Sequence, residues 1–299
     1  MTRVLARLSL CLALGGLACV TAEATATTQP EDASADAAAV EAARAFQVDY
    51  ERELRDDPRS FLTTIAAHYL GVGEHVVLTL RDGAWIEADE PDAVVFVVRD
   101  DALVVRTDDW ETIARESTIV PVGEDDRFSF GVSRQGEDWR VLVHDRDAPL
   151  RTGFPGIAWF PVDATRIVSA SFEPEPARTP KSLQTSRGTT KTVYLAGRLR
   201  FVLADRELEL LAFAYAPEAA PGEPWLVPFR DATSGAQTYA AGRYLELVAP
   251  AAGEARVVLD FNRAINPLCA YSEHYNCPMP PSFNRLELAI EAGARAPEH

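Results

Sequence analysis

The stretch VVLTLRDGAWIEADEPDAVVFVVRDDALVVR, residues 76–106, decides the fold class of this chain. Four short runs rich in Val, Ile, Leu, Phe and Trp alternate there with turn residues such as Asp82-Gly83 and Asp100-Asp101. Runs of this length and spacing predict antiparallel strands, because no intervening segment is long enough for a crossover helix. The stretch therefore predicts part of a small β-sandwich.

The same alternation of apolar runs and turn residues continues toward the C-terminus. Three more runs, at 116–120, 128–132 and 139–144, complete the predicted sandwich. Gly and Pro in RTGFPGIAWFPVD (151–163) interrupt the rhythm and predict a junction between two lobes. Beyond it we predict a second antiparallel sheet or barrel from strands at 166–172, 192–195, 198–203, 208–215, 225–228, 243–248, 256–261 and 286–290.

Two helices are predicted before the strands. Apolar residues three or four apart predict a helix over 39–56, and Asp57-Pro58 ends it. Ser60 is a suitable N-cap for a second short helix through Leu70. We thus expect a mainly β chain of two packed antiparallel lobes, 72–150 and 151–299, with two N-terminal helices within 39–71.

The N-terminus has the pattern of a secretion signal. Arg3 and Arg7 precede a short apolar run over 8–20, and small-x-small cleavage sites end at Ala24 and Ala26. Residues 1–26 are therefore predicted as a signal peptide and 27–38 as a flexible tether. We expect a periplasmic or extracellular protein, with a lipoprotein anchored through Cys19 as the alternative.

Removal of the signal would leave two cysteines, Cys269 and Cys277. Two cysteines close in sequence in an exported protein predict one disulfide bond. A zinc site with Glu273 and His274 would lack the usual ligand spacing, so we expect no metal.

The composition and net charge limit the classes of binding partner that we expect. The 299 residues contain 45 acidic against 29 basic side chains, a formal net charge of -16. Such a charge disfavours nucleic acid and anionic lipid surfaces. No apolar run is long enough to span a membrane, and no nucleotide-binding, GxSxG or HExxH motif occurs. We expect a monomer without a cofactor that binds a small polar or anionic molecule.

Two polar constellations are candidates for that binding. In VVLDFN (257–262), strand alternation places Asp260 and Asn262 on one face, which either lines a cavity or meets water. Asp231, in a polar turn, either satisfies local backbone groups or holds Arg243 at the mouth of a pocket.

A third feature is the acid-free segment 177–204 in this acidic chain, with the basic residues Arg178, Lys181, Arg187, Lys191, Arg198 and Arg200. These cations either attract an anionic ligand or pair with acidic strands beside them.

The C-terminal half also carries a family resemblance. LDFNRAINPLCAYSEHYNCPMPPSFNRLELAIEAGAR (259–295) and VPFRDATSGAQTYAAGRYLEL (227–247) resemble the C-terminal signature of a bacterial and archaeal family, domain of unknown function 1684. FLTTIAAHYLGVGEH and WRVLVHDRDAPLRTGFPGIAWFPVD are similar to its earlier blocks. The chain departs from the pattern at Ala240, Ala241, Leu268 and Ala294. The resemblance implies no established activity.

We therefore expect a ligand site in the second lobe, beneath a C-terminal segment that is either a lid or a clasp. Its predicted residues are Asp231, Ser234, Tyr239, Arg243, Tyr244, Asp260, Asn262, Asn266 and Asn284. One alternative is a hydrolase with Asp231 and Asp260 as its acid–base pair. A second is a structural or partner-binding envelope protein with an exposed apolar patch.

Overall fold

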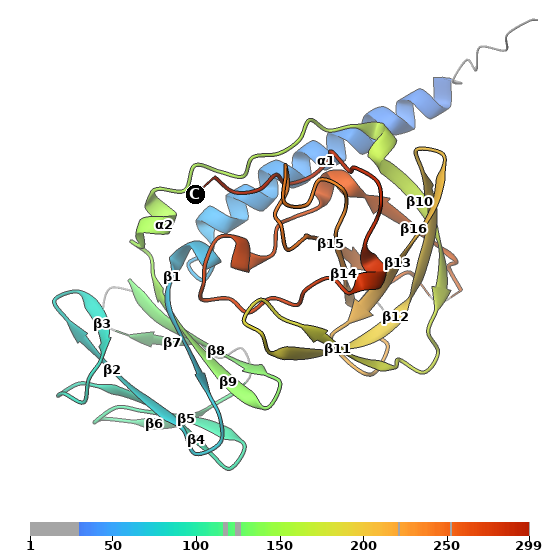
Figure 1. The fold of residues 1–299 in the computed structure, drawn as a ribbon. Helices are drawn as coiled ribbons and strands as arrows, with labels where there is room; N and C mark the ends of the chain where they lie inside the picture. Colours follow the sequence, from blue (N-terminus) through green and yellow to red (C-terminus); the bar gives the residue numbers. More distant parts are fainter. Residues whose placement is uncertain (1–29, 116–118, 123–126, 221, 252, 299) are drawn as a thin grey trace, which may run out of the picture.

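The computed structural model describes residues 30–115, 119–122, 127–220, 222–251 and 253–298. It confirms a mainly β chain built of two antiparallel lobes, with one long helix beside them (Figure 1). The predicted signal peptide, residues 1–26, lies outside the described residues. Within the described residues, no helix is both long and apolar enough to cross a bilayer.

The N-terminal lobe is a sandwich of two sheets. Its inner positions follow strict alternation: Val94, Phe96 and Val98 of one strand are buried, and they meet Phe130 and Val141 from the facing sheet. One sheet has the order β1 (Thr64–Leu70), β9 (Asp138–Asp145), β8 (Phe128–Gln135) and β7 (Ile119–Val122). The other has the order β3 (Ala84–Glu87), β2 (His75–Arg81), β4 (Val94–Arg99), β5 (Ala102–Arg106) and β6 (Glu111–Ala114).

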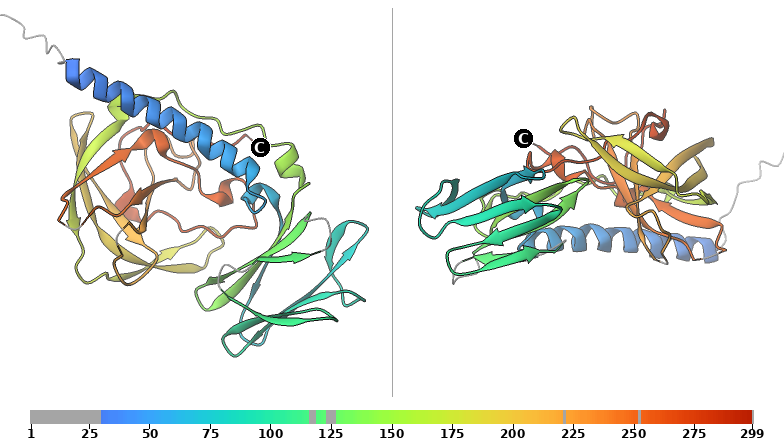
Figure 2. Two further views of the ribbon diagram at one scale, coloured as in Figure 1. Left: turned by 180° about the vertical axis from the view of Figure 1, so that it is seen from behind. Right: turned by 90° about the horizontal axis from the view of Figure 1, so that it is seen from below.

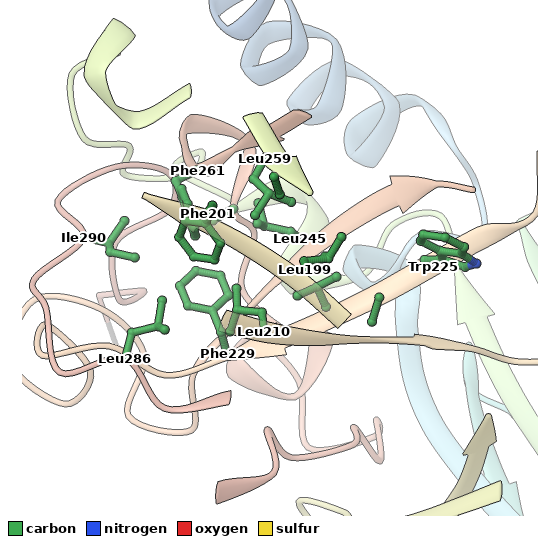
Figure 3. Close-up of a cluster of buried hydrophobic side chains, with 14 of the residues drawn as sticks. Leu199, Phe201, Leu210, Trp225, Phe229, Leu245, Leu259, Phe261, Leu286 and Ile290 are labelled. Atoms are coloured by element: carbon green, nitrogen blue, oxygen red, sulfur yellow. The ribbon is translucent and has the colours of Figure 1, made fainter. Parts of the chain in front are cut away.

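The C-terminal lobe is one large sheet that curls into a half-barrel (Figure 1). Its order is β15 (Arg243–Val248), β14 (Pro224–Phe229), β13 (Arg206–Ala214), β12 (Thr190–Leu203), β10 (Ile167–Pro174) and β16 (Arg256–Asp260), and β11 (Pro180–Gln184) pairs with β12. The two runs predicted at 192–195 and 198–203 are thus a single strand, whose register shifts near Gly197. Aromatic and aliphatic side chains fill the concave side (Figure 3).

The helical predictions are half right. α1 (Pro30–Asp56) includes the expected helix, and it begins at Pro30, so the predicted tether is helical from that residue onward. The prediction of a second helix is wrong. Ser60 is followed by a single 3-10 turn, η1 (Phe61–Thr63), and then by β1. Pairing with β9 completes the sandwich sheet, and this tertiary gain overrides the weak local helix pattern.

α1 lies along the C-terminal lobe, and its last turns reach the junction between the lobes (Figure 2). The side-chain amide of Gln47 donates to the Asn262 carbonyl at 3.0 Å, and the Trp159 indole donates to Glu51 at 2.7 Å. The junction itself contains the short helix α2 (Pro149–Thr152) and the 3-10 turn η2 (Ala164–Arg166).

Residues 261–295, here called the C-terminal segment, form no strand. The strand predicted over 286–290 is absent, and the segment instead contains the 3-10 turns η3 (Phe261–Arg263), η4 (Leu268–Ala270) and η5 (Ser282–Asn284). Leu286 and Ile290 insert into the half-barrel core beside Phe229 and Phe261 (Figure 3). These side chains close one end of the half-barrel without a strand ladder.

Candidate functional site

Asp231 and Arg243 pair as one of the sequence hypotheses expected, but they are sealed inside the lobe. The Arg243 Nη2 donates to Asp231 Oδ2 at 2.6 Å, and the two side chains are 1% and 0% exposed. The other carboxylate oxygen accepts from the Thr233 backbone N–H at 2.7 Å and from its hydroxyl. Asp231 is therefore saturated and out of reach of a substrate, which removes the support for an acid–base pair with Asp260.

The rest of the Arg243 guanidinium fastens the C-terminal segment. It donates to the carbonyls of Ile290 at 2.9 Å, Ala294 at 3.3 Å and Ala292. The preceding Gly242 has φ +102°, and a Cβ there would lie 2.5 Å from the Phe229 carbonyl oxygen. Only glycine fits that position, so the Gly242-Arg243 step of the signature is required by packing.

Asp260 and Asn262 also act locally. The strand ends at Asp260, so the predicted shared strand face does not exist; Asp260 Oδ1 instead caps η3 by accepting from the Asn262 N–H at 3.0 Å. The Asn262 amide is fully buried and makes two bonds of 3.0 Å to the backbone of Asp163. Through these bonds, Asp260 and Asn262 join the end of β16 to the junction between the lobes.

The two remaining asparagines have the same kind of role. Asn284 is fully buried and bridges strands, since its amide bonds the N–H and carbonyl of Leu211 and the carbonyl of Pro228 at 2.8–2.9 Å. Asn266 donates to the Arg295 carbonyl at 2.7 Å and to the Tyr271 hydroxyl at 3.0 Å. Both amides satisfy buried backbone groups that no ladder satisfies.

Ser234, Tyr239 and Tyr244 complete the predicted set. The Ser234 hydroxyl accepts from the Asp231 N–H at 3.2 Å. The hydroxyls of Tyr239 and Tyr244 donate to carbonyls of the C-terminal segment, at Cys269 and Pro278. None of the nine predicted residues lines any of five surface hollows of the described residues. Their hydrogen bonds fasten the C-terminal segment to the lobe, which fits a clasp.

A different place in the same lobe is open. A hollow of about 750 Å³ lies where β10, β12 and β14 meet the loop residues 219–220, 222–223, 249–251 and 253–255. We call it the mouth hollow. Its wall is mainly apolar, and its largest side chains are Phe172 and Trp225, whose rings lie 4.8 Å apart. Trp225 lies apart from Leu286 and Ile290 in the core cluster (Figure 3).

An ion pair borders the mouth hollow. Arg178 Nη2 bonds Glu223, and the side chains are 12% and 9% exposed. The same Glu223 oxygen accepts from the Trp225 indole N–H at 3.1 Å, which ties the ring to the pair. Among the described residues, the buried Arg178 Nη1 has no hydrogen-bond partner. An orphaned buried donor costs about 1–3 kcal/mol, which an acceptor oxygen would offset.

Two backbone features shape this wall. Arg178 has φ +44°, a left-handed conformation that costs a non-glycine residue about 1–2 kcal/mol. Gly197 lies under the Phe172 ring, and a Cβ there would come within 2.4 Å of that ring and of the Glu173 carbonyl oxygen. The missing side chain lets the Phe172 ring approach the backbone of β12 closely.

Sequence reasoning missed Phe172, Glu223 and Trp225. The one available signal was Arg178, the first cation of the acid-free segment. Further along that segment, Arg198 and Arg200 pair with Glu209, as the second interpretation of those cations expected.

The two cysteines are neighbours without being bonded. Both are free thiols in this structure, and the Cys269 backbone N–H donates to the Cys277 Sγ at 3.3 Å, so the disulfide stays a prediction. Across the described ranges, no three His, Cys, Asp or Glu side chains gather as metal ligands would.

Comparisons with known proteins give a family but no activity. No curated protein matches the chain. Among solved structures, the solution NMR structure of an uncharacterised Haloarcula marismortui protein is 36% identical; the match covers 48% of this chain and 78% of that protein, with a TM-score of 0.41. The model of the family "Protein of unknown function (DUF1684)" matches residues 152–295, and the chain belongs to this family.

Proposed function

We propose that the protein is an exported binding protein that takes a small molecule into the mouth hollow. The proposed ligand has an apolar body and an uncharged acceptor oxygen, such as a carbonyl. The single observation that carries this proposal is the unpartnered Arg178 Nη1 beside an aromatic wall.

The size and lining of the hollow support a small apolar body. About 750 Å³ is within the range of small-molecule sites, which are mostly apolar with a few polar anchors. The half-buried Phe172 offers apolar surface to such a body, and the buried Trp225 packs against it from the core side. A second hollow of about 680 Å³, beside Arg200 and Glu207, is a charged and exposed strand face that lacks this apolar lining.

The charges of the mouth hollow favour a neutral ligand over an anion. Its lining holds three carboxylates, Glu175, Glu223 and Glu254, against the one guanidinium of Arg178. These carboxylates, and the net charge of -16 on the whole chain, would repel a negatively charged group. A carbonyl oxygen can accept from Arg178 without that repulsion. The sequence led us to expect a small polar or anionic ligand; we propose instead a neutral ligand whose polarity is confined to one acceptor oxygen.

Export is part of the proposal. It rests on Arg3, Arg7 and the apolar run over 8–20, followed by small residues suited to cleavage. The expected result is a mature N-terminus near residue 25 or 27 in protein recovered outside the cytoplasm. Intact mass and N-terminal sequencing of that fraction check it, and an uncleaved cytoplasmic chain would contradict it.

Four probes that share one ring body test the ligand class. They are 2-acetylnaphthalene (a ketone), 2-ethylnaphthalene (no acceptor), 2-naphthoate (an anion) and 1-(2-naphthyl)ethylamine (a cation). We expect calorimetry or ligand-observed NMR to show the ketone binding about five- to tenfold more tightly than 2-ethylnaphthalene, the difference made by one hydrogen bond. The carboxylate should bind more weakly than the ketone.

Two variants assign the binding to the mouth hollow. Phe172→Ala, which removes the half-buried ring of the hollow, should weaken all four probes. The pair Arg178→Met with Glu223→Gln removes both charges together and should abolish the preference for the ketone. The matched control, Arg198→Met with Glu209→Gln, removes another ion pair of the same sheet outside the hollow and should leave the preference intact. A ketone preference that survives loss of Arg178 would refute the proposed anchor, and absence of binding by all four probes would refute the site.

A further inference from the structure

Cys269 and Cys277 lie close together in the C-terminal segment, outside the proposed ligand site. Cys269 is partly exposed, whereas Cys277 is buried behind it. The segment around them is held on both sides, because the Cys277 N–H donates to the Ser186 hydroxyl at 3.0 Å and the Tyr239 hydroxyl donates to the Cys269 carbonyl at 3.3 Å. The two sulfur atoms are therefore held side by side on a firm framework.

The two thiols are also chemically unequal. The thiol of Cys277 donates a hydrogen bond that lowers the pKa of Cys269 to about 6, and the hydroxyls of Ser186 and Tyr239 act in the same direction. The same bond to Cys269, with burial, raises the pKa of Cys277. An accessible acidic thiol in front of a buried, less acidic one is the arrangement of pairs that exchange disulfides.

We propose that Cys269 and Cys277 form a thiol–disulfide exchange site, in which Cys269 attacks a disulfide substrate and Cys277 resolves the mixed disulfide. In the first step the Cys269 thiolate bonds one sulfur of the substrate, the substrate S–S bond breaks, and its other sulfur leaves as a thiolate that takes a proton. In the second step Cys277 gives its proton to the solvent and attacks Cys269 Sγ. The second substrate thiol leaves and is protonated, so two electrons pass from the protein to the substrate.

The short sequence separation fits reversible chemistry. The ring closed by residues 269–277 is small, so its closure restricts the unfolded chain less than a long loop would. Its disulfide is therefore less resistant to reduction than one that spans a domain. The surrounding segment also reaches the other lobe, where the Tyr275 hydroxyl bonds Thr64 Oγ1 at 2.9 Å. Oxidation or reduction of the pair would therefore take place next to a contact between the two lobes.

Alkylation of the reduced protein tests the inequality of the thiols. Mass spectrometry after timed iodoacetamide treatment at pH 7 should show Cys269 modified at least about tenfold faster than Cys277, with a pH midpoint clearly below the ordinary value of about 8.5. Ser186→Ala should slow Cys269 several-fold by removing a donor, whereas Ser171→Ala, at an exposed position of β10, should not. Equal rates at the two cysteines would overturn the assignment of roles.

Equilibration of purified protein with glutathione buffers tests exchange itself. We expect glutathione disulfide to oxidise the pair and excess reduced glutathione to reduce it again, with a glutathione adduct trapped on Cys269 in Cys277→Ser. Thiols that stay reduced in glutathione disulfide would overturn the proposal. So would a disulfide that persists unchanged in about a hundredfold excess of reduced glutathione, because it would be purely structural.

Discussion

The two lobes solve the same problem, the closure of a β core, in different ways. The N-terminal lobe covers one sheet with another, and its core is filled by apolar side chains from alternate positions on the strands. The C-terminal lobe has only a half-barrel, and an irregular chain segment closes it. That segment brings backbone groups into the interior that no ladder can pair.

The comparison explains why the family signature is so polar. Buried N–H and carbonyl groups must be bonded, and here buried side chains bond them: Arg243, Asn262, Asn266 and Asn284. A cluster of Asp, Asn and Arg in a signature is therefore no sign of catalysis in itself. In this lobe such residues replace the hydrogen bonds of a missing strand.

The sharpest test of this contrast is the loss of one carboxylate charge in each lobe. Asp231→Asn leaves the buried Arg243 without its counter-charge, so we expect a loss of about 3–5 kcal/mol in the free energy of unfolding. Asp101→Asn breaks an ion pair with Arg134 in which the carboxylate is 80% exposed, and should cost less than about 1 kcal/mol. Denaturant titration measures both, and equal costs would remove the distinction between the lobes.

The next effect is a pH dependence that belongs to the N-terminal lobe. Burial lowers the pKa of His144 from 6.5 to about 4, while its Nδ1 lies 3.0 Å from the Thr63 hydroxyl. The unfolded state then takes up the proton first, so stability is complete above pH 6.5 and falls as the pH drops toward 4. From this residue we expect a loss of about 2–3 kcal/mol at pH 4.5.

Unfolding measured at pH 7.5 and pH 4.5 checks the histidine. In His144→Asn, most of the difference between the free energies of unfolding at pH 7.5 and pH 4.5 should disappear. The lowered pKa values of His68 and His274 act with the same sign and leave a remainder. A wild-type protein whose stability is the same at both pH values would contradict the buried neutral His144.

The smallest expected effect concerns the cap at the end of β16. Asp260→Ala removes the acceptor for the Asn262 N–H and the partner of Arg263, and should cost about 1 kcal/mol. Asp108→Ala, at an exposed position between β5 and β6, is the control. Thermal unfolding distinguishes them, and a loss above about 3 kcal/mol at Asp260 would indicate a role beyond capping.

Strand alternation was enough to predict most of the fold. The runs in 76–106 became β2 to β5, because period-two patterning and short turns leave few alternatives. The failures lie where tertiary context decides. Residues 64–70 carry a helix-like pattern but supply the strand that completes a sheet, and 286–290 resembles a strand but finds no partner strand.

The candidate site was predictable only in part. From the sequence, pairing of Asp231 with Arg243 was one of two interpretations, beside local bonds to the turn backbone, and Asp231 makes both kinds of bond. The sequence held no sign that the free side of Arg243 faces three carbonyls contributed about fifty residues later. The mouth hollow was invisible for the same reason, because Phe172, Arg178 and Trp225 come from separate elements that only the curled sheet brings together.

Binding and stability measured in parallel on two variants test the central claim most directly. For Arg178→Met with Glu223→Gln, we predict at least fivefold weaker binding of 2-acetylnaphthalene, with unfolding changed by no more than about 1 kcal/mol. For Asp231→Asn, assayed where it remains folded, we predict affinity within about twofold of wild type despite its large loss of stability. A folded Asp231→Asn protein that no longer binds the ketone would place the site at the signature residues and contradict this account.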